Sequence, residues 1–284
     1  MSRIERRRDR RERERATRRR QTQRRSIWRG PLPIVAALGA IVVVIAAFVV
    51  LRNAGGTNAS ASPNDRDAVV AAVTSVRSDV YDAVRGGSVT NSLVPRTVDV
   101  LRGPGGKPVV VYVGAEYCPY CASERWSLIA ALARFGRFSG LTLTMSSSTD
   151  VYPNTPTFTF RGSTFSSDVL EFAPVETADR TARPLDSPSP LQSQSYARYD
   201  PDGSIPYVSV ADRVTRVGSG YVPDTLAGKS WQQIAAQLAD PSSPVAKAIL
   251  GEANYLSASL CVVTNRQPAS VCDSASVRDL LPTQ

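Results

Sequence analysis

The sequence contains no histidine among its 284 residues. This absence excludes histidine-based catalytic triads, histidine-ligated zinc and copper sites, and the most common general base near neutral pH. Any chemistry must rely on cysteine, carboxylate, tyrosine or lysine. No glycine-rich phosphate loop follows a predicted strand, because residues 103–106 (Gly-Pro-Gly-Gly) predict only a turn. The sequence therefore gives no support for nucleotide binding.

Cysteine is scarce, and it occurs as two close pairs. The four cysteines are Cys118, Cys121, Cys261 and Cys272. An even number with close spacing is typical of proteins from an oxidising compartment. A zinc site is the alternative for the first pair, but zinc generally takes four ligands, histidine is missing, and the second pair is remote in sequence. We therefore favour a redox pair at Cys118 and Cys121, and expect no metal and no other cofactor.

Charge is unevenly distributed along the chain. Residues 1–30 contain 14 arginines against four acidic residues, which gives +10, whereas the other 20 basic and 21 acidic residues give −1. Arginine clusters can bind nucleic-acid phosphates, but acidic residues interrupt this one, and residues 1–27 hold no aromatic side chain to stack on bases. We expect the tail to set membrane topology and to contact anionic lipids, with no nucleic-acid partner.

An uncharged segment follows the tail. Residues 31–51 are 21 largely apolar residues, which as a helix would extend about 31 Å and match the hydrocarbon core of a bilayer. The arginines before this segment predict a cytoplasmic N-terminus by the positive-inside rule. The sequence thus predicts a single-pass cell-membrane protein with residues 1–30 in the cytoplasm and residues 52–284 outside it.

A cleaved secretory signal is the alternative for this segment. We favour an uncleaved transmembrane anchor, because the charged region is long and the apolar run exceeds that of a usual signal. Arg24 and Arg25, followed by Ser-Ile-Trp, also fit a loose twin-arginine export pattern. An arginine-rich tail produces such pairs readily by chance.

Beyond the span, the pattern predicts a flexible linker and one α/β domain. Residues 52–64 are rich in Gly, Ser, Asn and Ala and form the linker, and residues 65–284 form the domain. The strand at 141–145 is expected to run parallel to the strand at 108–113 through a βαβ crossover. The polar, proline-rich residues 186–195 predict a surface loop. Hydrophobic spacing predicts helices at 65–84, 122–135, 230–238 and 244–260, and further strands at 157–161, 168–176, 206–210 and 213–217.

The first cysteine pair lies between the predicted strand at 108–113 and the helix that follows. Cys118 falls near the helix N-cap and Pro119 at the first helical position, where its missing N–H costs nothing. Free backbone N–H groups and the positive end of the helix dipole favour a thiolate at Cys118. Cys121 lies one turn further on, within reach of a disulfide to Cys118. This arrangement predicts a redox pair, with a static structural disulfide as the alternative.

The second pair flanks a ten-residue polar loop after a predicted helix. Cys261 and Cys272 therefore predict a structural disulfide, which would stabilise the tail by roughly 2–3 kcal/mol on loop-entropy grounds. A relay that passes electrons to Cys118 and Cys121 is the alternative.

These features together resemble the thioredoxin superfamily. The resemblance rests on the strand–CxxC–helix–strand order, on Ile205-Pro206 opening a hairpin, and on a terminal helix after Gly218. The stretches VYVGAEYCPYCASERW and GSIPYVSVADR more closely resemble a membrane-anchored thioredoxin-like family called domain of unknown function 929. The resemblance covers roughly residues 65–275, and that family name implies no activity.

The resemblance implies a thioredoxin-like fold with a C-terminal helical extension. It also implies a cis peptide bond before Pro206, which with Ile205 would hold a substrate chain opposite the disulfide, while Tyr117 and Tyr120 form an apolar rim. Many thioredoxins carry a buried carboxylate on the strand before the motif, where it accepts a proton from the second cysteine. Here Tyr112 stands at that position.

Two functions are consistent with the sequence. The first, which we favour, is a membrane-anchored oxidoreductase that acts on thiols or disulfides of extracytoplasmic proteins, with Cys118 as the nucleophile and Cys121 as the resolving residue. A membrane electron-transfer partner would suit this function. The second is a non-catalytic envelope module that binds a partner on a thioredoxin-like scaffold. Oxidation, reduction and isomerisation of disulfides all use this motif.

Overall fold

A computed structural model describes residues 63–281. The predicted tail at 1–30, the predicted span at 31–51 and nearly all of the predicted linker lie outside these residues. The linker was predicted two residues too long, because the first described helix already begins at Pro63, and proline is tolerated in a first helical turn. Within residues 63–281, no helix is both long and apolar enough to cross a membrane.

Five strands form the central sheet, in the spatial order β1–β9–β8–β2–β7. Their bounds are Val94–Pro95 (β1), Val109–Gly114 (β2), Glu171–Glu176 (β7), Tyr207–Val210 (β8) and Val214–Val217 (β9). β2 is parallel to β7 and antiparallel to β8, and the β8–β9 and β9–β1 pairs are antiparallel. β2 is buried along its whole length, as its run of valines predicts for a strand covered on both faces.

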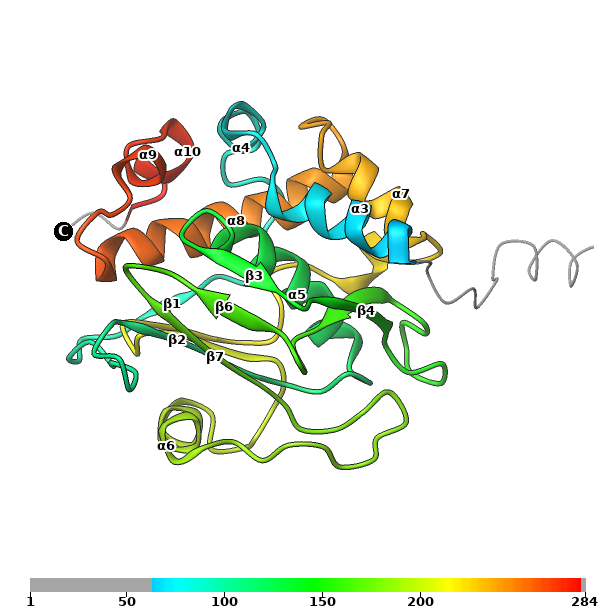
Figure 1. Ribbon diagram of the computed structural model, residues 1–284, viewed down its shortest axis with the longest axis horizontal. Coiled ribbons are helices and arrows are strands. Elements are labelled where there is room, and N and C mark those ends of the chain that lie inside the picture. Colours follow the sequence, from blue (N-terminus) through cyan, green and yellow to red (C-terminus); the bar gives the residue numbers. More distant parts are fainter. Residues whose placement is uncertain (1–62, 282–284) are drawn as a thin grey trace, which may run out of the picture. The chain divides into compact units, whose positions relative to one another are not determined.

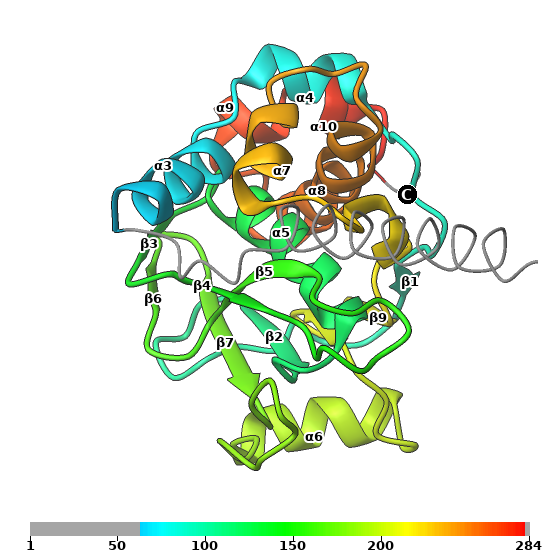
Figure 2. The same cartoon turned by 90° about the vertical axis from the view of Figure 1, so that its right-hand side faces the viewer.

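Helices cover both faces of this sheet (Figure 1). The helices on one side are α3 (Pro63–Thr74), α4 (Ser78–Val84), α5 (Pro119–Leu132), α7 (Trp231–Gln237), α8 (Pro244–Val263), α9 (Ala269–Cys272) and α10 (Ala275–Arg278). Figure 2 shows α6 (Pro190–Tyr199) on the opposite side. A short 3-10 helix, η2 (Pro223–Leu226), follows the last strand.

The pleat of β2 divides its side chains between two hydrophobic clusters. Val110 and Tyr112 belong to the larger cluster, which also holds the apolar residues of α5 and α8. Val111 and Val113 belong to the smaller cluster, against which Leu191 of α6 packs. The buried strand therefore ties both helical layers to one element, and α5 follows directly from its end.

Two small antiparallel ribbons lie beside the central sheet, and they correct one prediction. One pairs β3 (Arg137–Ser139) with β6 (Thr164–Ser166), and the other pairs β4 (Thr142–Met145) with β5 (Pro156–Thr159). The predicted parallel pairing of residues 141–145 with the strand at 108–113 is therefore wrong, and β7 takes that place. Alternation of Leu143 and Met145 with threonines gives β4 a single apolar face, which suits a ribbon better than a strand buried on both faces.

The other differences concern helices. The predicted helix at 65–84 is two helices, α3 and α4, with a break at residues 75–77 that lets α3 contact α7 while α4 contacts α8. The predicted loop at 186–195 contains the start of α6, because Ser189 and Gln192 form a capping box and Pro190 lies in the first turn. The predicted hairpin at 206–217 and both late helices are confirmed.

Candidate redox site

The Cys118–Cys121 motif forms the turn that joins β2 to α5. Cys118 is the N-cap of α5, with φ −77° and ψ 122°, and Pro119 lies in the first helical turn. The Cys118 sulfur accepts a hydrogen bond from the Cys121 backbone N–H at 3.1 Å. The predicted position of Cys118 at the helix N-terminus is confirmed, so its sulfur lies where unpaired N–H groups favour negative charge.

Both cysteines are buried, and they differ slightly in exposure. Both cysteines are free thiols; Cys118 is 6% exposed, whereas Cys121 is fully buried. A thiol can attack a protein disulfide only if its sulfur can be approached. Cys118, the less buried of the two, is therefore the candidate attacking residue, and Cys121 the candidate resolving residue.

The local interactions also separate the acidities of the two thiols. A hydrogen bond from the Cys121 thiol lowers the pKa of Cys118, burial opposes this effect, and the Cys121 backbone N–H and the Arg125 charge lower it further. Burial raises the pKa of Cys121 well above its usual range, and the adjacent Cys118 sulfur raises it further. Cys118 is therefore the more acidic of the two thiols.

The peptide bond before Pro206 is cis, as the resemblance predicted. The Cys118 sulfur lies 3.8 Å from the carbonyl oxygen of Ile205. The Pro206 carbonyl accepts a hydrogen bond from the Gly218 N–H at 2.8 Å, so the far end of the hairpin holds this turn. Two segments 87 positions apart thus meet at the Cys118 sulfur.

Two tyrosines border the site from the α5 side. Tyr120 is 37% exposed and packs edge-on against Tyr152, with 6.0 Å between ring centroids. Tyr117 is half-buried and lines a hollow of about 600 Å³ with residues 147–151 and 180–182. Both predicted rim residues therefore lie beside Cys118, and the residues around 147–151 and 180–182 extend that rim beyond what the sequence indicated.

A buried ion pair, which the sequence did not predict, lies on the inner side of the motif. Arg125 Nε donates to Glu176 Oε1 at 2.8 Å, and Arg125 Nη2 donates to Glu176 Oε2 at 2.7 Å. The same Nη2 donates to the Ala115 carbonyl at 2.7 Å. Both side chains are at most 1% exposed. The only sequence signal was the spacing of four residues between Cys121 and Arg125, which places them on one helix face.

A second buried ionic cluster joins α5 to β9 and α8. Arg216 Nη2 donates to Glu124 Oε1 at 2.7 Å and also binds Glu252. Glu252 Oε1 accepts from the Gly220 N–H at 3.0 Å, and Arg216 Nε donates to the Gly218 carbonyl at 3.1 Å. Burial raises the pKa of Glu124 well above its usual range, Arg216 opposes this, and Glu252 adds to it. The cluster therefore fixes the chain just after the hairpin.

Tyr112 occupies the position where the resemblance implied a carboxylate. Its ring lies 5.9 Å from the Arg125 guanidinium carbon, and its hydroxyl is buried with no hydrogen-bond partner within the described part of the chain. Burial raises the pKa of Tyr112 well above its usual range. Tyr112 is therefore a neutral phenol near neutral pH and not a proton acceptor for Cys121.

The second cysteine pair forms the predicted disulfide. Cys261, in the last turn of α8, is bonded to Cys272, the last residue of α9, with 5.6 Å between their Cα atoms. Both cysteines are fully buried. This bond fastens the loop after α8 to the helical layer.

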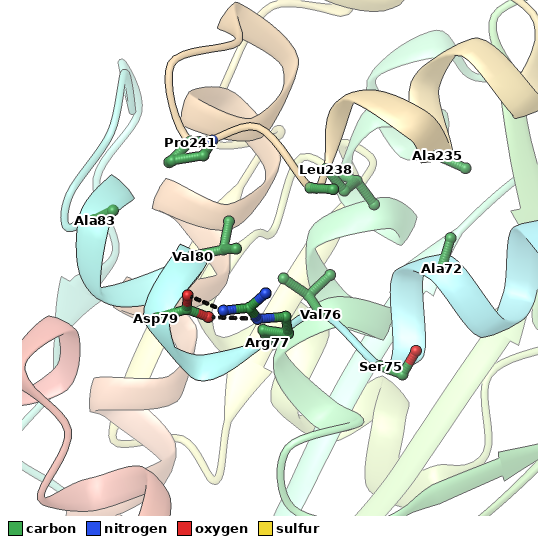
Figure 3. A pocket seen from close by; sticks show the side chains of 11 residues that line it. Ala72, Ser75, Val76, Arg77, Asp79, Val80, Ala83, Ala235, Leu238 and Pro241 are labelled. Atoms are coloured by element: carbon green, nitrogen blue, oxygen red, sulfur yellow. Dashed lines mark hydrogen bonds and ion pairs between the residues drawn. The ribbon is translucent and has the colours of Figure 1, made fainter.

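An apolar hollow of about 440 Å³ lies between α3, α4 and α7 (Figure 3). Most of its lining consists of alanine, valine, leucine and proline side chains. Its two charged lining residues, Arg77 and Asp79, bind each other, with 2.9 Å between Arg77 Nε and Asp79 Oδ1. The lining therefore supplies no group for chemistry, and the CxxC turn is the candidate site.

Comparison with known families gives a match to a family without an assigned function. Residues 102–187 match the family model described as domain of unknown function (DUF929). The match spans β2, the CxxC turn, α5 and β7, and it ends before Pro206 and the C-terminal helices. No curated protein and no solved structure matches the chain. The chain is thus similar to this family over the region that contains the two free cysteines.

Proposed function

We propose that the protein is a membrane-anchored thiol–disulfide oxidoreductase with a thioredoxin-like fold, acting on extracytoplasmic proteins. The observation that carries this proposal is the Cys118 sulfur at the N-terminus of α5, 3.8 Å from the Ile205 carbonyl. Supporting the fold assignment is the order β2–α5–β7, with a parallel strand pair, followed by α6, the β8–β9 hairpin and α8. The resemblance to thioredoxins rests on the same strand–CxxC–helix–strand order, although it places the second strand at residues 141–145, where the structure instead has a ribbon strand.

The reaction proceeds by two thiol–disulfide exchanges. The Cys118 thiolate attacks one sulfur of a substrate disulfide, a mixed disulfide forms, and the departing substrate sulfur leaves as a thiolate. Cys121 then loses its proton and attacks the Cys118 sulfur, which releases the second substrate sulfur and leaves a Cys118–Cys121 disulfide. Two electrons have passed to the substrate. The reverse sequence oxidises a substrate dithiol.

The buried surroundings of Cys121 determine where its proton goes. Neutral Tyr112 is no base, and Glu176 is occupied by Arg125. The substrate thiolate released in the first exchange is formed beside the site and is the proton acceptor. The substrate chain lies against Ile205 and Pro206, between these residues and the rim formed by Tyr117 and Tyr120.

A pair of matched variants tests this function. In cells, Cys121→Ser should accumulate mixed disulfides between Cys118 and partner proteins, because the resolving sulfur is missing. Cys118→Ser should accumulate none, although it differs from the first variant only in which sulfur is removed. For both variants, mixed disulfides are detected on non-reducing gels as higher-mass bands that disappear after reduction. If neither variant traps a partner, the non-catalytic scaffold function replaces this one.

A further inference from the structure

The buried guanidinium of Arg125 comes from α5, the helix that also carries Cys121. Cys121 and Arg125 are four residues apart and lie on one face of the helix. Helical side chains lean toward the N-terminus of their helix, and Arg125 does so, since its Nη2 reaches the Ala115 carbonyl that precedes both cysteines. The Cys118 backbone N–H also donates to that carbonyl, at 3.3 Å. Arg125 therefore fixes the start of the CxxC turn through its hydrogen bond to the Ala115 carbonyl.

The charge of Arg125 is neutralised on one edge only. Glu176 binds the guanidinium through Nε and Nη2, and in this planar group Nη1 is then the nitrogen farthest from the carboxylate. Nη1 is buried and has no hydrogen-bond partner among residues 63–281. Buried donors without a partner are rare and call for an explanation. Arg216 Nη1 of the second ionic cluster is likewise unpaired among residues 63–281, but Arg125 is the residue one helical turn after Cys121.

We propose that Arg125 is a positioning residue that biases the Cys118–Cys121 pair toward its dithiol state, so that the pair accepts electrons from dithiols of extracytoplasmic proteins. This inference rests on the proposed function. A fixed positive charge stabilises a thiolate, whereas a disulfide has no charge to stabilise. A pair whose reduced form is stabilised is the stronger oxidant. A buried carboxylate at the same place would act in the opposite direction.

The local acidities agree with this geometry. After the hydrogen bond from the Cys121 thiol, the Arg125 charge is among the interactions that lower the pKa of Cys118. The same charge limits the rise that burial produces in the pKa of Cys121. Arg125 thus favours the ionised form of both sulfurs, and both are sulfurs of the reduced site.

The oxidising step balances without another reactant. A substrate thiolate attacks the Cys118 sulfur, the Cys118–Cys121 bond breaks, and Cys121 leaves as a thiolate near Arg125. Cys121 takes the proton of the second substrate thiol, and the new substrate thiolate attacks the mixed disulfide and releases Cys118 as a thiolate. The substrate loses two electrons and two protons, of which one proton goes to Cys121 and the other to solvent. A disulfide-bearing partner restores the oxidised pair.

Two variants of the ion pair test the role of Arg125 by the sign of their effects. Arg125→Gln/Glu176→Gln removes both charges and leaves no lone buried ion. It should shift the equilibrium of the full-length protein with glutathione about tenfold toward the disulfide, equivalent to about 30 mV for a two-electron couple. Glu176→Gln alone leaves the guanidinium without its counterion and should shift the equilibrium toward the dithiol. If the ion pair had only a structural role, the two variants would not shift the glutathione equilibrium in opposite directions.

Glu252→Gln is the matched control, because it removes a buried carboxylate from the second ionic cluster. It should lower the melting temperature and leave the glutathione equilibrium within twofold of the wild type. Equal equilibria in the wild type and in Arg125→Gln/Glu176→Gln would overturn the inference, as would shifts of the same sign in both Glu176 variants. If Glu176→Gln does not fold, the double variant still decides.

The direction of the reaction is tested with a peptide that carries two cysteines. The oxidised full-length protein should convert the reduced peptide to its disulfide in a single turnover, more completely than the Arg125→Gln/Glu176→Gln variant does. Complete reduction of the oxidised peptide by the dithiol protein, with no reaction in the other direction, would contradict the inference while leaving the oxidoreductase function in place. Absence of exchange in both directions, together with no trapping by Cys121→Ser, would instead remove the proposed function itself.

Discussion

The two cysteine pairs of this protein differ in spacing, because Cys118 and Cys121 are three positions apart and Cys261 and Cys272 are 11 apart, and they also lie in different environments. Cys118 begins a helix, is a free thiol and retains a small exposed surface, whereas Cys261 lies in the last turn of a helix and is bonded to Cys272. A helix N-terminus stabilises a thiolate and a helix C-terminus does not. Burial of both sulfurs in the second pair also closes the approach of another thiol. Helix end and exposure therefore separate the candidate redox pair from the structural one, in addition to their difference in sequence spacing.

The largest expected difference between the pairs is in disulfide exchange. Cys118→Ala should lower the rate of exchange with a small disulfide on the order of a thousandfold, because it removes the nucleophile. Cys261→Ala/Cys272→Ala, assayed below its melting temperature, should retain a rate within a fewfold of the wild type. Stopped-flow absorbance with a chromogenic disulfide measures both rates. Equal losses of exchange rate in the two variants would show that the two cysteine pairs do not differ in reactivity.

The next difference is in stability. Cys261→Ala/Cys272→Ala should reduce the free energy of unfolding by roughly 2–3 kcal/mol, because the closed loop no longer restricts the unfolded chain. Cys118→Ala should have a smaller effect, since it breaks no covalent bond. Urea unfolding followed by circular dichroism gives both values. A greater loss of stability for Cys118→Ala would show that the CxxC turn is the structural element.

The smallest expected effect is on the pH dependence of alkylation. The pKa of Cys118 is lowered, so its thiolate fraction, and with it the rate of reaction with iodoacetamide, should reach half-maximum at a lower pH than in the urea-unfolded protein. At pH 7 the thiolate fraction of Cys118 should therefore exceed that of an unfolded cysteine. The pKa of Cys121 is raised, so Cys121 should stay unmodified over the same range. Mass spectrometry of tryptic peptides assigns each product, and a Cys118 midpoint at or above that of the unfolded chain would contradict the assignment.

Local signals carried the parts of the fold that the sequence predicted correctly. The valine run of β2, the position of Cys118 at the start of α5 and the β8–β9 hairpin each depend on residues close together in the chain. The start of α6 was also encoded locally, since Ser189, Pro190 and Gln192 form a recognisable helix start. The polar, proline-rich composition of residues 186–195 predicts a loop, whereas the order of these three residues indicates a helix start.

Contacts between distant segments account for the rest. The partner of β4 is a neighbouring ribbon strand and not β2, which local periodicity cannot distinguish. Glu124 and Arg125, adjacent on α5, bind Arg216 and Glu176, which lie 92 and 51 positions away. Charged residues on an amphipathic helix are usually solvent-exposed, so no local pattern identifies this pair as buried. The electrostatics of the candidate site therefore became visible only in the folded chain.

A redox titration that resolves the two pairs tests the central claim most directly. The full-length protein is equilibrated in glutathione buffers of graded ratio, its free thiols are blocked with a mass label, and each cysteine is quantified by mass spectrometry. The account predicts that Cys118 and Cys121 gain and lose their labels together as one two-electron couple, while Cys261 and Cys272 stay unlabelled throughout. A Cys118–Cys121 pair that remains in one state across the range, or a Cys261–Cys272 pair that titrates in its place, would contradict it.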